Sequence, residues 1–100
     1  MPIYMDRHFV EDATRSALAD AHEKDLMIQG KHDVKFLTYW FDEERCTAFC
    51  LVKAPNKESI QSAHDEAHGS VPHEIIEVDP AIVKSFLGRV DDPEPADSTI

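Results

Sequence analysis

The 100-residue sequence predicts an α+β domain with the ferredoxin-like order strand, helix, strand, strand, helix, strand (βαββαβ). Two observations lead to this prediction. Short β-branched and aromatic segments alternate with segments rich in helix formers, and residues 18–25 resemble residues 60–67 at an offset of 42 positions. We therefore expect two similar halves that form an antiparallel sheet with two helices on one face, as in dimeric α/β barrels.

The first half should contain a strand, a helix and a second strand. Residues 3–9 carry aromatic and aliphatic side chains around a polar set, which is typical of a strand. Asp12 and Thr14 then offer helix-starting side chains to the helix formers of residues 15–29, and Gly30 should end that helix. Residues 34–41 are β-branched and aromatic and predict the second strand.

The second half is expected to repeat this order. Residues 42–45 should form the turn of a hairpin, and residues 47–53 should continue it as extended chain. Asn56 is the expected cap of a second helix that runs to His68, where Gly69 should end it. Residues 74–78 complete the unit as its last strand.

The chain divides into three expected parts. Residues 1–78 form the ferredoxin-like domain, and residues 79–88 form a short helical extension, in which a proline suits the first turn. Residues 89–100 are acidic, contain two prolines, and are expected to be a disordered tail.

Composition excludes several classes of partner. Twenty acidic and ten basic residues give a net charge of -10, and no basic patch exists that would neutralise the phosphates of a nucleic acid. No run of roughly 18 apolar residues predicts a membrane span, and the start of the chain does not look like a signal peptide. Cys46 and Cys50 lie four residues apart in an expected strand, too far for a disulfide. We expect reduced thiols and a cytoplasmic location.

The second strand carries bulky residues on both faces. Strict alternation would place on one face Phe36, Thr38 and Trp40, and on the other Leu37, Tyr39 and Phe41. Two helices cover only one face of such a sheet, so the other aromatic set needs a partner. We therefore expect a homodimer that packs through the open sheet face.

Candidate metal ligands occupy matching positions in the two halves. The 42-residue offset aligns His22 with His64 and His8 with Cys50. On a helical wheel, His22 and Asp25 fall inside the apolar arc of the first helix. Burying an imidazole and a carboxylate costs several kcal/mol unless each is paired or ligated.

The second helix adds His68, which shares a face with His64 at i,i+4 spacing. The candidate metal ligands are therefore His8, His22, Asp25, Cys50, His64 and His68. A mixed set of imidazoles with a thiolate or carboxylate suits nickel, zinc or copper rather than magnesium or calcium. Asp25 or Asp6 would alternatively serve behind the ligands, as acceptors for a histidine ring.

Each of these residues also has an ordinary structural interpretation. His22 with Asp25 would be a hydrogen-bonded pair, Cys50 an inert core thiol, and His8 an exposed strand residue. His68 would cap the end of its helix. Four ligand-type residues in register between the halves nevertheless favour a metal site.

Several short segments resemble a small bacterial nickel-binding family, long described as a domain of unknown function. These segments are Tyr4-Met-Asp-Arg-His8, Ala21-His-Glu-Lys-Asp25, Phe49-Cys-Leu51, Ala54-Pro55, Ala63-His64 with Ala67-His-Gly69, and Glu74-Ile-Ile-Glu-Val78. The resemblance covers about residues 3–78. It implies a ferredoxin-like homodimer that binds nickel without an established reaction, in metal homeostasis or sensing.

Two other functions remain open from the sequence. The same dimeric architecture is similar to that of small isomerases, monooxygenases and lyases, in which His8, or His22 with Asp25, would transfer protons. The second of these functions is that of a regulatory module whose acidic tail contacts a partner. Walker, Rossmann and CxxC signatures are absent, which disfavours nucleotide-dependent and redox enzymes.

Overall fold

A computed structural model describes residues 1–70 and 72–87 of the chain. The first half contains β1 (Ile3–Phe9), α1 (Arg15–Ile28), the 3₁₀ helix η1 (Gln29–His32) and β2 (Lys35–Asp42). The second half contains β3 (Thr47–Lys53), α2 (Lys57–Ala67), β4 (Glu74–Val78) and α3 (Pro80–Leu87). The expected order of elements is confirmed, while the acidic tail predicted for residues 89–100 lies outside the described residues.

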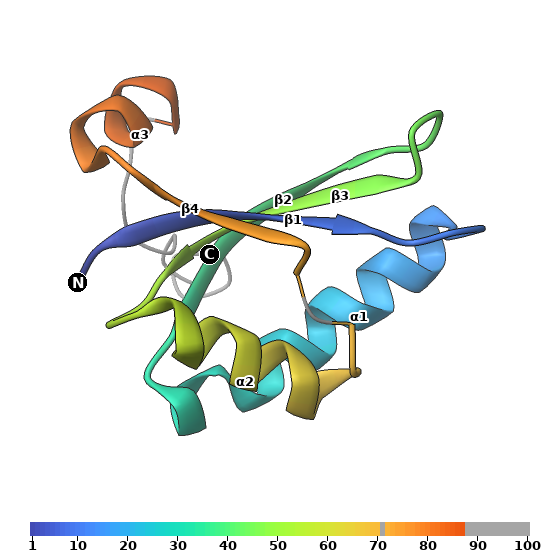
Figure 1. The fold of residues 1–100 in the computed structure, drawn as a ribbon, viewed down its shortest axis with the longest axis horizontal. Helices are drawn as coiled ribbons and strands as arrows, with labels where there is room; N and C mark the ends of the chain where they lie inside the picture. The colour runs from blue at the N-terminus through green and yellow to red at the C-terminus, as the bar shows by residue number, and fades with distance from the viewer. Residues whose placement is uncertain (71, 88–100) are drawn as a thin grey trace, which may run out of the picture.

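The four strands form one antiparallel sheet in the order β2-β3-β1-β4. The central strands are therefore β1 and β3, and the edges are β2 and β4. Figure 1 shows α1 and α2 together on one face of this sheet and α3 on the opposite face. The ferredoxin-like prediction is confirmed.

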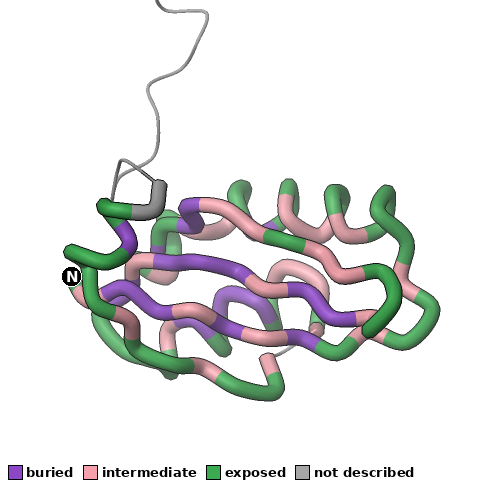
Figure 2. The backbone as a smooth tube through the Cα atoms, turned by 90° about the horizontal axis from the view of Figure 1, so that it is seen from above, coloured by how far each residue is buried: buried purple, intermediate pink, exposed green. Residues whose placement is uncertain are grey.

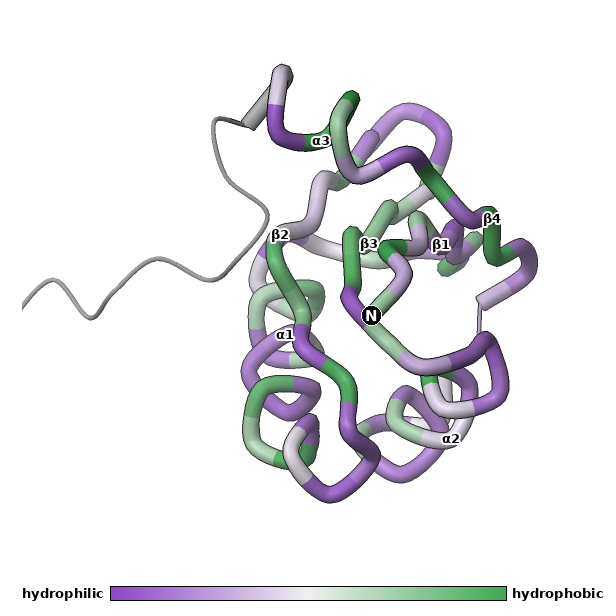
Figure 3. Tube along the Cα trace, turned by 90° about the vertical axis from the view of Figure 1, so that its left-hand side faces the viewer, coloured by the Kyte–Doolittle hydropathy of each residue, from purple (hydrophilic) through white to green (hydrophobic). Residues whose placement is uncertain are grey.

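Apolar side chains fill two layers, one on each face of the sheet. The layer under α1 and α2 contains Tyr4, Val34, Phe36, Val52, Ala54, Ile60 and Ala63. Buried positions concentrate in the strands (Figure 2), whereas hydrophobic and hydrophilic residues alternate along α1 and α2 (Figure 3). The sheet thus supplies most of the core, and the two helices close it from one side.

The opposite face is less open than the sequence predicts. Val83 of α3 is 7% exposed and packs against Ile3, Leu37 and Leu51. The C-terminal helix therefore covers part of the face that was expected to be free for a partner. Trp40 remains 45% exposed on the uncovered part.

A bulge in β2 overturns the expected alternation of its side chains. Phe36 pairs with Val52 and Thr38 pairs with Leu51, so Leu37 is an extra residue in this strand. The prediction that Phe36 shares a face with Thr38 and Trp40 is wrong. Phe36 points toward the helices instead, and so does Tyr39, which strict alternation placed on the other face from Phe36.

The ends of the helices follow local chemistry. The Thr14 hydroxyl accepts a hydrogen bond from the amide of Ala17 at 3.1 Å, and Asn56 accepts one from Ser59 at 2.9 Å. Gly30 was predicted to end the first helix, but the helical chain passes through it. The α-helix ends at Ile28, the chain continues as the 3₁₀ helix η1, and the residue after η1, Asp33, has a left-handed conformation.

The second helix ends near the expected glycine. Gly69 has a φ of +81°, a left-handed conformation that follows the cap residue His68. Cys46 also has a positive φ, of 49°, and lies in the hairpin turn rather than in the strand. Within residues 1–70 and 72–87, none of the helices has the length and apolarity needed to cross a bilayer.

Candidate metal centre

Four potential metal ligands meet under the sheet, where β1 and β3 face α2. Asp6 and His8 alternate on the helix-facing side of β1, and Cys50 lies directly opposite Asp6 on β3. His64 reaches them from α2. Each of the four residues offers one ligand atom, and these atoms lie within 4.8 Å of one another. All four residues are buried, so the fold brings a nitrogen, oxygen and sulfur donor set together away from water.

His64 lies at the centre of this arrangement, with no exposed surface. Its Nε2 is 2.8 Å from Asp6 Oδ2, and its Nδ1 is 3.0 Å from Asp25 Oδ1. Both ring nitrogens thus face carboxylates and donate when the ring is an imidazolium. Burial lowers the pKa of His64, but the hydrogen bonds to Asp25 and Asp6 outweigh it and raise that pKa to about 9.

The two carboxylates respond in the opposite sense. Burial raises the pKa of Asp6, but the hydrogen bond from His64 and the close approach of the His8 ring outweigh this effect and lower it below the usual value. The same balance lowers the pKa of Asp25, where the hydrogen bonds come from His64 and His68. In the metal-free protein, an imidazolium is therefore held between two carboxylates.

A second cluster consists of Asp25, His64 and His68. Asp25 Oδ1 accepts a hydrogen bond from His68 Nε2 at 3.0 Å, in addition to the one from His64. The Nδ1 atom of His68 accepts the backbone N–H of Ser70 at 3.1 Å, so the proton of the neutral ring resides on Nε2. The acid–base alternative named His8, or His22 with Asp25, as the proton-transfer groups, whereas the histidines hydrogen-bonded to Asp25 here are His64 and His68.

The first cluster differs because two of its atoms lack hydrogen bonds. His8 Nε2 lies 3.0 Å from Asp6 Oδ1, but the alignment is unsuitable for a hydrogen bond. Both atoms are buried and have no hydrogen-bond partner among the described residues. Such atoms are costly in a folded protein unless something else satisfies them.

Cys50 completes the cluster, and in the metal-free protein its side chain is a protonated thiol. Burial raises the pKa of this thiol well above its usual value, and the negative charges of Asp6 and Asp25 raise it further. The thiol is therefore inert as a nucleophile without a cation beside it. A bound cation would reverse this preference, because a coordinated thiol loses its proton.

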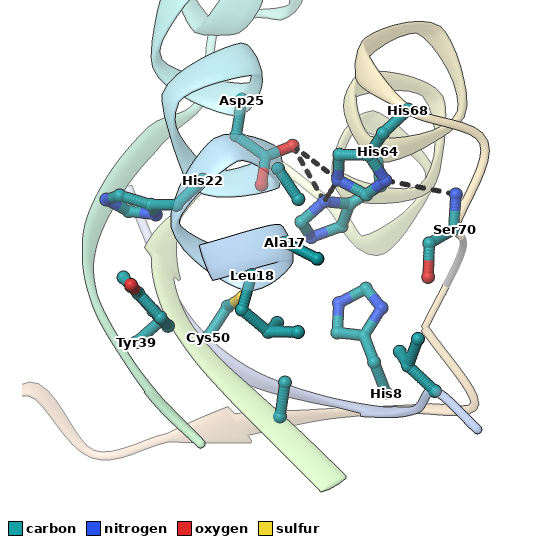
Figure 4. Close-up of a pocket in the computed structure, with 13 residues that line it drawn as sticks. His8, Ala17, Leu18, His22, Asp25, Tyr39, Cys50, His64, His68 and Ser70 are labelled. Carbon is teal, nitrogen blue, oxygen red and sulfur yellow. Dashed lines mark hydrogen bonds and ion pairs between the residues drawn. The ribbon is translucent and has the colours of Figure 1, made fainter. Parts of the chain in front are cut away.

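A cavity of about 140 Å³ adjoins both clusters. Figure 4 shows it between α1, the sheet and the end of α2, with the histidines of the clusters at one end. Its polar lining comes mainly from His8, Asp25, Cys50, His64 and His68, with Ser70 beside them. The remaining walls are mostly apolar.

Five of the six predicted ligands lie in one cluster or the other, and His22 lies in neither. Its ring lines the cavity, with its centroid 4.6 Å from the centroid of the Tyr39 ring. Asp25 is the buried residue of α1, whereas His22 is half-buried and Leu26 is 40% exposed. The buried face of α1 is thus centred on Asp25, and the aligned histidines are not spatial equivalents.

Asp6 is the residue that the predicted ligand list left out. It was expected only as an acceptor for a histidine ring, yet it contacts both His8 and His64. The sequence contained a signal for Asp6, because strand alternation places it between Tyr4 and His8 on one face of β1. The structure shows that all three residues are buried. His32, the last residue of η1, and His73, which precedes β4, lie outside both clusters.

Comparisons with known proteins gave two matches. Residues 4–78 match the model of a protein family described as "Nickel responsive protein SCO4226-like". Among solved structures, the chain is similar to SCO4226 from Streptomyces coelicolor A3(2), with 34% sequence identity and a TM-score of 0.71. That similarity covers 76% of this chain and 94% of the other. A search of curated proteins gave no match.

Proposed function

Because this chain belongs to the family of SCO4226-like nickel responsive proteins, we propose that it binds a nickel ion and serves in nickel homeostasis or sensing. The observation that carries the proposal is the cluster of Asp6, His8, Cys50 and His64, whose ligand atoms lie within 4.8 Å of one another. Imidazole nitrogens and a thiolate suit nickel, zinc and copper, whereas magnesium and calcium prefer oxygen ligands.

The choice between the two clusters follows from their hydrogen bonds. Asp25 and His68 are already satisfied by one another, by His64 and by the backbone of Ser70. In contrast, His8 Nε2 and Asp6 Oδ1 are buried without hydrogen bonds. A metal ion ligated by the first cluster would satisfy both atoms, so we assign the ligands to Asp6, His8, Cys50 and His64.

Asp25 then acts behind the metal rather than on it. A ligating histidine usually donates its second ring N–H to a carboxylate, which fixes the ring and strengthens the metal bond. His64 would present Nε2 to the metal while Nδ1 keeps its hydrogen bond to Asp25, 3.0 Å away. The row from His68 through Asp25 to His64 therefore orients the metal-binding ring.

The direct test is metal retention. Protein stripped with a chelator and dialysed against nickel should retain a single ion per chain, measured by mass spectrometry of the metal content. Cys50→Ser should lose nickel and the ultraviolet charge-transfer absorption of a nickel thiolate, while Cys46→Ser should keep both. The matched histidine pair is His8→Ala, which should weaken binding, and His32→Ala, which should not.

Two outcomes would contradict the assignment. Absence of retained nickel in the wild-type protein would remove the proposed function altogether. Equal loss in the Cys46 and Cys50 variants would show that nickel binds elsewhere. Zinc and copper fit the same donor set, so parallel dialysis against each ion establishes the preference.

We also propose that the protein is a homodimer that uses the uncovered part of the α3 side of the sheet. Trp40 and Ile76 are 45% and 42% exposed there, and Phe49 lies beside Trp40 on the neighbouring strand. Light scattering should give the mass of a dimer, and Trp40→Glu should give a monomer. Met27→Glu, at an 84% exposed position on α1, should stay dimeric. A monomeric wild-type protein would contradict this proposal.

A cytoplasmic location is the last part of the proposal. Both cysteines are free thiols, which is typical of proteins in a reducing compartment. The proposed thiolate ligand also depends on Cys50 remaining reduced. Fractionation of cells that produce the protein, followed by detection with an antibody, would test the location.

A further inference from the structure

The cavity beside the clusters is larger than the small voids of an ordinary protein core. It measures about 140 Å³ and is partly open, with the exposed Ala17 in its lining. Its size results from small side chains on facing elements, with Ala17 and Ala21 on α1 and Ala48 on β3. An apolar cavity of comparable size is known to bind benzene. The cavity therefore has room for a compact organic group.

The walls and the end of the cavity differ in chemistry. Val10, Leu18 and the three alanines line the sides, together with the rings of His22 and Tyr39, which pack against each other. At one end the cavity meets Asp25, His8 and His68 (Figure 4). A complementary ligand thus has an apolar body and one polar head.

The charged groups at the polar end of the cavity determine which ligand head group fits there. Among the described residues that line the cavity, Asp25 is the only carboxylate, and none is a lysine or an arginine. Asp25 lies on the cavity surface, and Figure 4 shows its second oxygen directed away from the two histidines. The net charge of -10 attracts cations to the whole molecule as well.

We propose that this cavity binds a small organic cation, a primary amine or amidine attached to an apolar body about the size of a six-membered ring. The body would lie between Ala21 and Tyr39, and the cationic head would donate hydrogen bonds at the Asp25 end. The site goes beyond the proposed nickel function and does not depend on it, because the argument concerns the metal-free protein.

Benzylamine is a suitable probe, and phenylacetate is its control with a similar body and an anionic head. Titrations by calorimetry and amide NMR, in the presence of a chelator, should show benzylamine binding at least about tenfold tighter, since a hydrogen bond to a charged group contributes roughly 1.5–3 kcal/mol. The chelator keeps metal out of the assay. The benzylamine result therefore does not depend on whether the protein binds nickel, and the two proposals can fail separately.

Matched substitutions on α1 locate the site. Ala21→Leu places a larger side chain in the cavity and should abolish benzylamine binding. Ala19→Leu makes the same change at an exposed position outside the cavity and should leave binding unchanged. Ala17→Leu, nearer the start of the helix, provides a second cavity-filling variant if Ala21→Leu does not fold.

Four results would overturn the proposal. Three of them are no benzylamine binding, equal binding of phenylacetate, and equal loss in the Ala19 and Ala21 variants. Amide shifts confined to residues away from Ala21 and Tyr39 would do the same. Selective binding that Ala21→Leu removes and Ala19→Leu preserves would establish the site.

Discussion

The stability of the metal-free protein should fall as the pH rises from 6.5 to 9, because His64 is held as an imidazolium. The pKa of His64 is about 9 in the folded protein, against an ordinary value of 6.5. A group whose folded pKa is raised stabilises the fold fully below its unfolded pKa and ceases to do so above its folded pKa. The stabilisation is therefore complete below pH 6.5 and lost by about pH 9.

The magnitude follows from the size of the shift. A difference of about 2.5 pKa units corresponds to roughly 3 kcal/mol of unfolding free energy below pH 6.5, at 1.36 kcal/mol per unit. About 2 kcal/mol of this should be lost between pH 6.5 and 8.5. His64 is fully buried, so solvent does not screen its two carboxylate contacts.

Urea unfolding in the presence of a chelator, followed by circular dichroism at several pH values, measures this loss directly. Asp25→Asn removes one of the two carboxylates and should flatten the pH profile, whereas Asp79→Asn, at an exposed position before α3, should not. A midpoint near pH 9 for the His64 ring in NMR titration would support the same reasoning. Unfolding free energy that stays constant or rises over this pH range would refute it.

Two further predictions concern the metal and the core. Nickel binding at pH 7 should release about two protons, from the His64 ring and the Cys50 thiol, since ligands must be deprotonated. Calorimetry in buffers of different ionisation enthalpy counts them, and nickel binding without proton release would exclude these ligands. Ile60→Ala, at a position of α2 with no exposed surface, should lower the unfolding free energy by about 2–5 kcal/mol. Ile82→Ala, at a position that is 63% exposed, should change it by less than about 0.5 kcal/mol, and similar losses in both would contradict the core described above.

The fold was largely predictable because its signals are local. The bounds of β1, β3 and β4 coincide with the predicted segments, since alternation and turn residues mark strands within a few positions. The bulge at Leu37 was not predictable from alternation. An extra residue in one strand is determined by its pairing with β3, which the sequence of β2 alone does not contain.

The site was predictable in part, for a related reason. Helical spacing and the alignment of the halves identified His64 and Asp25, which the structure places 3.0 Å apart from different helices. The same alignment misplaced His22, because the rotation of α1 depends on how the helix packs on the sheet. Asp6 lies on the buried face of a short strand. A buried carboxylate there indicates that some side chain or ion must pair with it, but the sequence of the strand does not say which.

The extra residue at Leu37 also selects which aromatic ring borders the cavity. Tyr39 pairs with Cys50 and faces the cavity, while Trp40 pairs with Phe49 on the opposite side. If the same residues paired with β3 without a bulge, simple alternation from Phe36 would turn Trp40 toward the cavity and Tyr39 away from it. The irregular register of one edge strand, and not a change in any metal-binding side chain, therefore determines whether a phenol or an indole borders the cavity.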